Sequence, residues 1–151
     1  MELELGRVTD RKPPFKFSSL TRVGFSDTDA QGIVYYGRYL PYFDAARVEY
    51  HRHLRMRYEE FDGELVMRAT TIEYHAPARF DDLVEVFVRV QRIGRTSMTY
   101  ELAAYLVEVD VLNVTAHQRL VLVDLAERQA CPVPDGIRTK ISSFEGADAE
   151  V

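Results

Sequence analysis

The 151-residue chain has one cysteine, no tryptophan and no long apolar run. The single cysteine, Cys131, cannot form an internal disulfide, and it lies outside any Cys/His spacing typical of a structural zinc site. No apolar stretch approaches the roughly 20 residues that a membrane-spanning helix needs, and the acidic first residues do not indicate a signal peptide. We therefore expect a cytoplasmic protein with no membrane span and no bound metal.

Positive charge is also in short supply. The 19 lysines and arginines are outnumbered by 24 aspartates and glutamates, which gives a net charge of −5. Nucleic-acid binding needs a dense basic face, so we expect no nucleic-acid partner. The hydrophobic fraction of 46% and the length suit one domain with a substantial core. We expect that domain over residues 15–145, after a flexible lead-in (1–14) and before a short tail (146–151).

The hydrophobic pattern changes period along the chain. Apolar residues at helical spacing predict one amphipathic helix that starts near Gly37 and carries Pro41 in its first turn: Tyr36, Leu40, Phe43, Ala46, Tyr50 and Leu54. Alternating or β-branched stretches predict strands over residues 15–25, 64–75, 83–93, 96–108 and 114–125. Short turns between the later strands indicate an antiparallel meander. The pattern predicts an α+β fold, in which a five-stranded curved sheet wraps one long helix and leaves edge strands open to pair across a dimer.

The segment between the first strand and the helix carries the clearest chemistry. Asp29 places a carboxylate just before the helix, and Gly32 permits a positive φ or a close backbone approach. The free N–H groups around Tyr36 and Gly37 form a helix N-terminus, which favours a developing negative charge. Such a site could hold a substrate carbonyl, with its carbon facing the carboxylate and its oxygen facing the N–H groups. This arrangement is typical of acyl transfer.

This segment resembles the active-site region of a known enzyme family. The matching positions are Asp27-Thr28-Asp29, Gly32, Ile33-Val34, Tyr35-Tyr36 and Tyr39, followed by Tyr74, Pro77-Ala78-Arg79-Phe80 and Asp82. They resemble the hotdog-fold acyl-CoA thioesterases, in the branch of 4-hydroxybenzoyl-CoA thioesterase and the Tol-Pal-associated acyl-CoA thioesterase. The resemblance covers about residues 16–145. Gln31 departs from the small residue often found before this glycine, which leaves the substrate identity open.

The resemblance implies an acyl-CoA thioesterase that releases a free acid and coenzyme A. Asp29 would be the catalytic carboxylate, either as nucleophile or as general base, and the Tyr36 backbone N–H would polarise the thioester carbonyl. Gly32, Ile33 and Val34 would line the substrate site. The resemblance also implies a homodimer, commonly assembled into a homotetramer, with sites between subunits. It implies no cofactor, because coenzyme A is part of the substrate.

Other polar residues receive weaker roles. We place contacts to the coenzyme A phosphates at Arg92, Arg95 and Ser97, which flank a turn between two strands. Asp27 is expected to hold the loop by accepting backbone N–H bonds. A related thioesterase branch uses a glutamate on its central helix, but we expect Glu49 to be surface or interface charge.

The histidines give no clear site. His51 and His53 lie two apart on the predicted helix, so they point to different sides and do not suggest a shared metal. His117 is expected to be a strand residue, and His75 is a distant candidate for lining the pocket. Two other functions stay open: a non-catalytic acyl-CoA or lipid-binding module, and a hotdog hydratase or dehydratase, which usually needs a histidine paired with a carboxylate.

Overall fold

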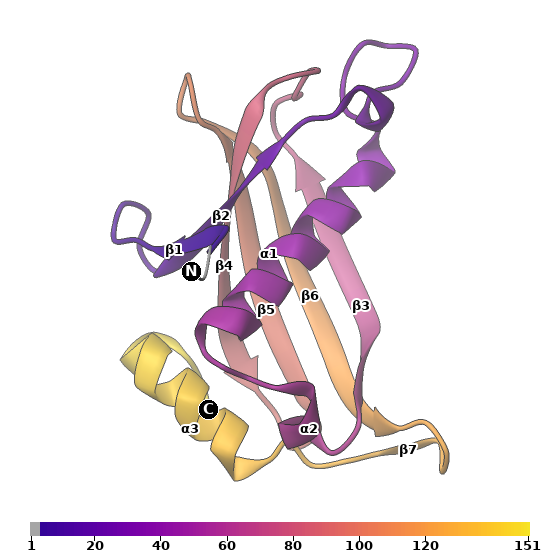
Figure 1. The fold of residues 1–151 in the computed structure, drawn as a ribbon, viewed down its shortest axis with the longest axis vertical. Coiled ribbons are helices and arrows are strands. Elements are labelled where there is room, and N and C mark those ends of the chain that lie inside the picture. Colours follow the sequence, from indigo (N-terminus) through magenta and orange to yellow (C-terminus); the bar gives the residue numbers. More distant parts are fainter. Residues whose placement is uncertain (1–3) are drawn as a thin grey trace.

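The computed structural model describes residues 4–151 and shows one seven-stranded antiparallel sheet with a long helix on one face (Figure 1). The strands are β1 (Gly6–Val8), β2 (Phe17–Arg22), β3 (Glu64–Tyr74), β4 (Leu83–Ile93), β5 (Ser97–Leu106), β6 (Val111–Asp124) and β7 (Gln129–Ala130). The helices are α1 (Tyr39–His53), α2 (Tyr58–Phe61) and α3 (Asp135–Glu145). The α+β class and the helix-on-sheet arrangement are confirmed. The predicted count of five strands omitted the short strands β1 and β7.

The core lies between α1 and the inner face of the sheet. The alternation in β4 turns its valines toward α1, and they are fully buried: Val84, Val86, Val88 and Val90. Helix α1 buries Tyr39, Tyr42, Phe43, Ala46 and Tyr50 against them. Tyr36 and Leu40, which the predicted stripe included, are exposed. The reason is that a 3-10 turn, Tyr36–Arg38, precedes α1, so the α-helical period begins only at Tyr39.

The strand order differs from a simple meander. Strands β4, β5 and β6 are consecutive neighbours, but β3 crosses to the far edge and pairs with β6, while β2 pairs with β4. The meander prediction is therefore wrong for β3. As an edge strand, β3 is exposed along its length except at Leu65 and Ile72.

The segment predicted as a flexible lead-in is structured where the structure describes it. Strand β1 pairs with β2, and Phe15 packs with Phe87 and Ala103 in a second apolar cluster on the outer face of the sheet. Arg11 lies over the Phe87 ring and also binds the buried carboxylate of Glu85. This coverage explains why β4 is buried on both faces. Residues 1–3 of the predicted lead-in lie outside the described residues.

The C-terminal segment closes the end of the core that lies away from the start of α1. Helix α3, which the sequence analysis did not predict, buries Ile137 and Ile141. In the predicted tail, the backbone of Glu150 bonds to Gln91 and Ile93 on the free edge of β4. Within residues 4–151, no helix has the length and apolar character that crossing a membrane requires.

Candidate active site

The loop that carries Asp29 is a tight hairpin. Thr28 and Val34 form an isolated bridge, the Asp29 N–H donates to the Ile33 carbonyl at 3.0 Å, and the Gly32 N–H donates to the Asp29 carbonyl at 3.0 Å. Gly32 has a φ of +78°, the left-handed conformation that closes such a loop and that glycine adopts readily. The Gln31 N–H donates to Asp29 Oδ1 at 2.8 Å. Among the described residues Asp29 Oδ2 has no hydrogen-bond donor, so it is free to meet a substrate or a water.

Asp27 anchors this loop, as the sequence predicted. Its Oδ2 accepts the Gly24 N–H at 2.9 Å and the Tyr42 hydroxyl at 2.7 Å, and its Oδ1 accepts two bonds from Arg38. Burial on its own raises the pKa of Asp27. The bonds from Tyr42, Gly24 and Arg38 outweigh it and bring the pKa below its ordinary value. Asp27 is therefore a charged structural acceptor, which leaves Asp29 as the available carboxylate.

The helical segment after the loop begins at Tyr36. The Val34 N–H donates to the Ala78 carbonyl and the Tyr35 N–H donates to the Asp27 carbonyl, which fixes the chain just before the first helical turn. The structure gives the Tyr36 N–H no acceptor among the described residues, as expected for the first position of a helix. Residues 36–53 are continuously helical, so their aligned peptide dipoles favour negative charge at this N–H.

Asp29 and Tyr36 line one open cavity of about 380 Å³. Its walls combine the hairpin loop, the start of the helical segment and the end of β3 with the loop that follows: Asp29, Gln31, Ile33, Val34, Tyr36, Tyr39, Tyr74, His75, Ala76 and Pro77. Among the predicted substrate-binding residues, Ile33 and Val34 belong to this cavity, whereas Gly32 shapes the loop from outside it. His75, a distant candidate from the sequence, is part of the wall, with its Nε2 3.0 Å from the Thr115 hydroxyl.

Tyr39 and Tyr74 matched the family pattern without an assigned role, and Asn113 was not a candidate; all three contribute hydrogen bonds around the site. The fully buried Asn113 donates from Nδ2 to the Tyr39 hydroxyl at 3.1 Å and to the Ala76 carbonyl at 2.5 Å. The Tyr74 hydroxyl donates to the Tyr36 carbonyl at 3.0 Å. These bonds join the loop after β3 to the helix start. Asn113 lies just before the predicted strand 114–125, whereas the structure places it within β6.

Arg92, Arg95 and Ser97 lie away from the Asp29 cavity within one chain. Ser97 pairs with Val121, which pairs with Val66 near the start of β3, whereas the cavity adjoins Tyr74 at the end of that strand. About eight residues of strand separate the two levels, or roughly 27 Å. Arg95 is exposed, and Arg92 lies 4.0 Å from Glu150. A single chain therefore does not bring these three residues to Asp29.

The other polar residues considered in the sequence analysis lie outside the Asp29 cavity. Glu49 lies 3.9 Å from Arg52 on α1 and is not part of the Asp29 cavity. His51 is partly buried with its Nε2 2.5 Å from the Tyr100 hydroxyl, whereas His53 lies 3.9 Å from Glu4, so the two histidines do not share a site. Cys131 is a free, partly buried thiol. Across residues 4–151 no cluster of three His, Cys, Asp or Glu side chains is arranged to hold a metal ion.

Comparison with known proteins places the chain in a family. The family model described as the thioesterase-like superfamily matches residues 23–141. The chain belongs to this superfamily. Its curated relatives include the acyl-CoA thioester hydrolase YbgC of Escherichia coli O6:H1, which is 33% identical over 77% of this chain and 88% of that protein. The acyl-CoA thioesterase YbgC of Haemophilus influenzae is 31% identical over 81% of this chain and 91% of that protein.

Solved structures of this superfamily share the fold. A Thermus thermophilus thioesterase, crystallised with coenzyme A and zinc, superposes with a TM-score of 0.75 at 26% identity, over 85% of this chain and 93% of that one. The hotdog architecture expected from the sequence is thereby confirmed, and the protein is a thioester hydrolase by family.

Proposed function

We propose that this superfamily member hydrolyses acyl-CoA thioesters to a free acid and coenzyme A, with Asp29 as the catalytic carboxylate. The observation that supports the proposal is that Asp29 and Tyr36, the first residue of the helical segment 36–53, line one cavity. The names of the Escherichia coli and Haemophilus influenzae relatives, an acyl-CoA thioester hydrolase and an acyl-CoA thioesterase, support the substrate class.

The chemistry needs a base or nucleophile and a place for negative charge. The thioester oxygen accepts the Tyr36 N–H, and the helix dipole stabilises the charge that develops on this oxygen as the carbonyl carbon is attacked. The C–S bond then breaks, and the thiolate of coenzyme A leaves and takes up a proton. Water supplies the oxygen of the acid product, so the proposal includes no resident cofactor or metal.

Asp29 has two chemically distinct ways to act. As a general base it takes a proton from the attacking water; as a nucleophile its oxygen forms an anhydride with the acyl group, which water then hydrolyses. A single turnover in ¹⁸O-water tests the nucleophilic route. If water attacks the Asp29 carbonyl of the anhydride, the label enters the Asp29 carboxylate and the acid takes an unlabelled oxygen from Asp29. A general base places the label in the acid, so label in Asp29 identifies the nucleophile.

The test of the proposal is thiol release from a panel of aryl, short-chain and long-chain acyl-CoAs. We expect Asp29→Asn to lower kcat/KM by at least about a hundredfold on the preferred substrate while the protein keeps its melting temperature. Asp81→Asn is the matched control, because Asp81 is an exposed loop aspartate outside the cavity. Tight acyl-CoA binding without turnover by the wild type would instead favour the non-catalytic binding module.

We further propose that the working unit is a dimer that pairs through β3. Its 11 residues form an exposed strand with an open edge, which is the surface that a second copy extends most directly. Light scattering measures whether the particle is this dimer or a tetramer built from two such units. In a Cys131→Ser background, Ala69→Cys at the middle of β3 should form a disulfide with its own symmetry mate under oxidation, whereas Val109→Cys should not.

This dimer supports the coenzyme A contacts assigned to Arg92, Arg95 and Ser97. Antiparallel pairing of two β3 strands sets the start of one beside the end of the other, which carries the partner's turn between β4 and β5 toward the Asp29 cavity. A double variant, Arg92→Ser with Arg95→Ser, should raise KM for acyl-CoA and leave hydrolysis of an acyl-pantetheine, which lacks the nucleotide phosphates, unchanged.

The position of His75 bears on a second candidate reaction, the hydration of enoyl-CoA. His75 lines the Asp29 cavity, and a histidine with a carboxylate is the pair that a hydratase needs. The His75 Nε2 is engaged by Thr115 rather than by Asp29, which favours hydrolysis. Enoyl-CoA absorbance separates the reactions: loss of the conjugated double bond without thiol release would identify a hydratase.

The cytoplasm is our proposed compartment. The supporting observation is the single free thiol of Cys131, which suits a reducing environment. Fractionation of cells that produce the native protein tests this directly.

A further inference from the structure

An apolar patch lies on the outer face of the sheet, which points away from α1. Its side chains come from β4, β5 and β6: Phe87, Ala103, Tyr105 and Leu112. The chain covers this patch with an N-terminal strap, residues 9–16, which is part of the indigo loop between β1 and β2 in Figure 1. The ring centroids of Phe15 and Phe87 lie 6.0 Å apart, and Phe15 is only 7% exposed. The strap therefore packs on the patch rather than projecting into solvent.

Two cationic side chains of the strap extend over the same patch. The Arg11 guanidinium carbon lies 5.6 Å from the centroid of the Phe87 ring, and Lys12 Nζ lies 4.3 Å from the centroid of the Tyr105 ring. Lys12 also pairs with Asp110 at 2.9 Å. Both aromatic faces are thus covered by cations whose outer sides are hydrated, which turns an apolar surface into a charged one.

A buried carboxylate fixes the strap to the sheet. Glu85 on β4 accepts the Ser18 hydroxyl at 2.6 Å. The same carboxylate oxygen accepts Arg11 and, at 3.3 Å, Arg7 from β1. Burial on its own raises the pKa of Glu85, but these bonds outweigh it and bring the pKa below its ordinary value. Without the N-terminal arginines this charge would be buried without a cation, so Glu85 favours the closed strap.

The C-terminal segment holds the other end of the strap. Lys16 Nζ donates to the Glu145 carbonyl and lies 3.3 Å from a carboxylate oxygen of Asp148. Arg89 on β4 donates to the Asp148 carbonyl at 2.9 Å. The strap is therefore fastened at both ends, by Glu85 near Arg11 and by the C-terminal segment at Lys16.

The strap fills the space that a second sheet would need. Helix α1 covers the inner face and the β3 edge is assigned to the dimer proposed above, so the outer face is the surface through which two dimers would stack. Sheets that stack face to face lie about 10 Å apart. The strap occupies this layer over β4 and β5. On the rest of the face, Glu73 and Arg119 are exposed, and two copies related by a two-fold axis can set such opposite charges together.

We propose that the outer face of the sheet is an interface for a second copy of this chain, and that the N-terminal strap keeps it closed, so that assembly stops at the dimer. Displacement of the strap would uncover Phe87 and Tyr105 together, and an apolar patch of this kind on a sheet face favours association. The inference goes beyond the proposed hydrolysis, because no strap residue lines the Asp29 cavity.

The first experiment measures particle mass by light scattering for a variant that begins at Pro14 and so lacks β1, Arg11 and Lys12. Glu85→Gln accompanies the truncation, so that no charge is left buried without its arginines. We expect four chains per particle. The matched control is Glu85→Gln in the full chain, which should stay at two chains, because the glutamine oxygen still accepts the strap arginines. A folded truncated variant of two chains, or a wild type of four, would overturn the inference.

The second experiment keeps the whole chain, so it does not depend on how the truncated variant folds. Arg11→Ser with Phe15→Ser releases the strap from Glu85 and Phe87. We expect the mass to rise from two toward four chains as the protein concentration increases. The control removes the same residue types at exposed positions outside the strap: Arg57→Ser with Phe25→Ser. Equal masses for the two double variants would contradict the inference.

The third experiment locates the interface in the truncated variant. Tyr105→Glu places a charge within the uncovered patch and should return the particle from four chains to two. Tyr58→Glu is the matched control, because Tyr58 is an exposed tyrosine on the α1 side of the sheet, and it should leave four chains. If both substitutions dissociate the particle, or neither does, another surface holds it together and the inference is wrong.

The inference, the β3 dimer and the proposed hydrolysis fail in different ways. If the wild type is a single chain in solution, the β3 dimer has failed. A doubling of mass on truncation that Tyr105→Glu reverses would then still support the closed face, and an unchanged mass would overturn it. Thiol release tests hydrolysis separately, and truncation should change kcat/KM by less than about twofold, since the strap lies outside the Asp29 cavity.

Discussion

The Arg38 guanidinium clasps the Asp27 carboxylate across the active-site loop, with Nε and Nη2 lying 3.0 and 2.8 Å from Oδ1. Arg38 belongs to the first helical turn and Asp27 to the chain before the Asp29 hairpin, so the bond ties the two sides of the loop together. Tyr42 and the Gly24 N–H hold the other carboxylate oxygen. The loop that carries Asp29 is therefore held in place by the charged Asp27 carboxylate, two residues earlier in the chain.

We predict that Asp27→Asn destabilises the protein by about 1–3 kcal/mol at pH 7, since it removes a charged acceptor from three donors. The pKa of Asp27 is lowered in the folded state, so its stabilising effect is present above the unfolded pKa of about 3.9 and is lost as pH falls through the folded value. Urea titrations at pH 7 and at pH 3 should show the difference from wild type shrinking at pH 3. A constant difference would mean that the charge of Asp27 does not matter.

Gly32 and Gly136 form a matched pair for testing the loop. A Cβ at either position meets nothing within 4 Å, but only Gly32 has a positive φ, +78°. Gly32→Ala should therefore cost about 1–2 kcal/mol of stability and lower thiol release, because the hairpin that holds Asp29 relaxes. Gly136→Ala, inside α3, should stabilise by up to about 1 kcal/mol and leave activity unchanged. Thermal melts and one kinetic assay check both, and equal effects would refute the role of φ.

Glu145 is fully buried at the end of α3. Its Oε2 accepts the Tyr50 hydroxyl at 2.6 Å and the Val90 N–H at 3.2 Å, while Oε1 has no partner among the described residues. Burial raises the pKa of Glu145 despite these bonds, so its contribution to stability is full below the unfolded pKa of about 4.3 and is lost as pH rises through the folded value. Relative to wild type, the melting temperature of Glu145→Gln should rise between pH 4 and pH 8. A pH-independent difference would show that folding does not raise the pKa of Glu145.

His51 gives the opposite kind of acid sensitivity. Its pKa falls from about 6.5 in the unfolded chain to about 3 through burial and Arg47, so stability is lost as pH drops below about 6.5. His51→Leu should be less stable at pH 7, because the Tyr100 hydroxyl loses its partner. Between pH 6 and pH 4, however, its stability should fall less steeply, by up to about 1.4 kcal/mol per pH unit. Unfolding titrations of the wild type and of His51→Leu measure this slope, and equal slopes would contradict the prediction.

Local patterns predicted the elements whose residues alternate strongly. Strand β4 begins and ends where the alternating valines of residues 83–93 indicated. The start of α1 was misplaced because a 3-10 turn uses residues 36–38 before the α-helical period begins. Helix α3 had a signal that was not used: Ile137 and Ile141 are four apart and follow Pro134, which is typical of a short helix that buries one stripe. Strand β1 has only three residues and forms because β2 is there to pair with it.

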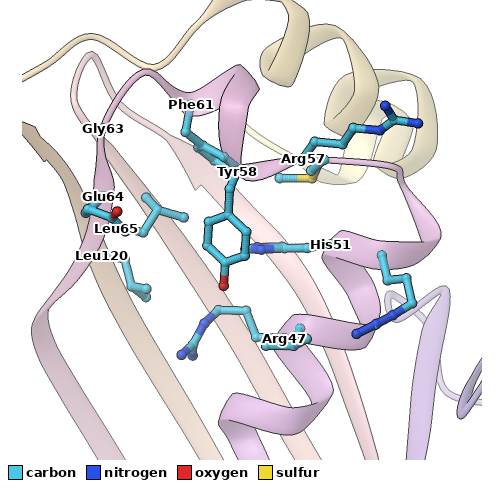
Figure 2. A pocket seen from close by; sticks show the side chains of 12 residues that line it. Arg47, His51, Arg57, Tyr58, Phe61, Gly63, Glu64, Leu65 and Leu120 are labelled. Carbon is cyan, nitrogen blue, oxygen red and sulfur yellow. The ribbon is translucent and has the colours of Figure 1, made fainter.

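The surroundings of Arg47 could not be predicted from its neighbours in the chain. Asp44 and Arg47 are three residues apart on α1, and their side chains form an ion pair at 2.6 Å. The same guanidinium donates to Gln118, 71 residues later, and lines a cavity of about 330 Å³ between α1, α2 and the start of β3 (Figure 2). A contact at this separation exists only because α1 packs over β6.

The sequence by itself determined the family and the local conformation of the Asp29 loop, since its turn bonds, its glycine and the following helix start involve residues within about ten positions of one another. Only the tertiary structure decided what surrounds that loop. The crossing of β3 to the far edge of the sheet brings Tyr74 and His75 to the cavity that Asp29 lines. That placement depends on which strands pair, and strand pairing is set by packing the whole inner face against α1 rather than by any local pattern.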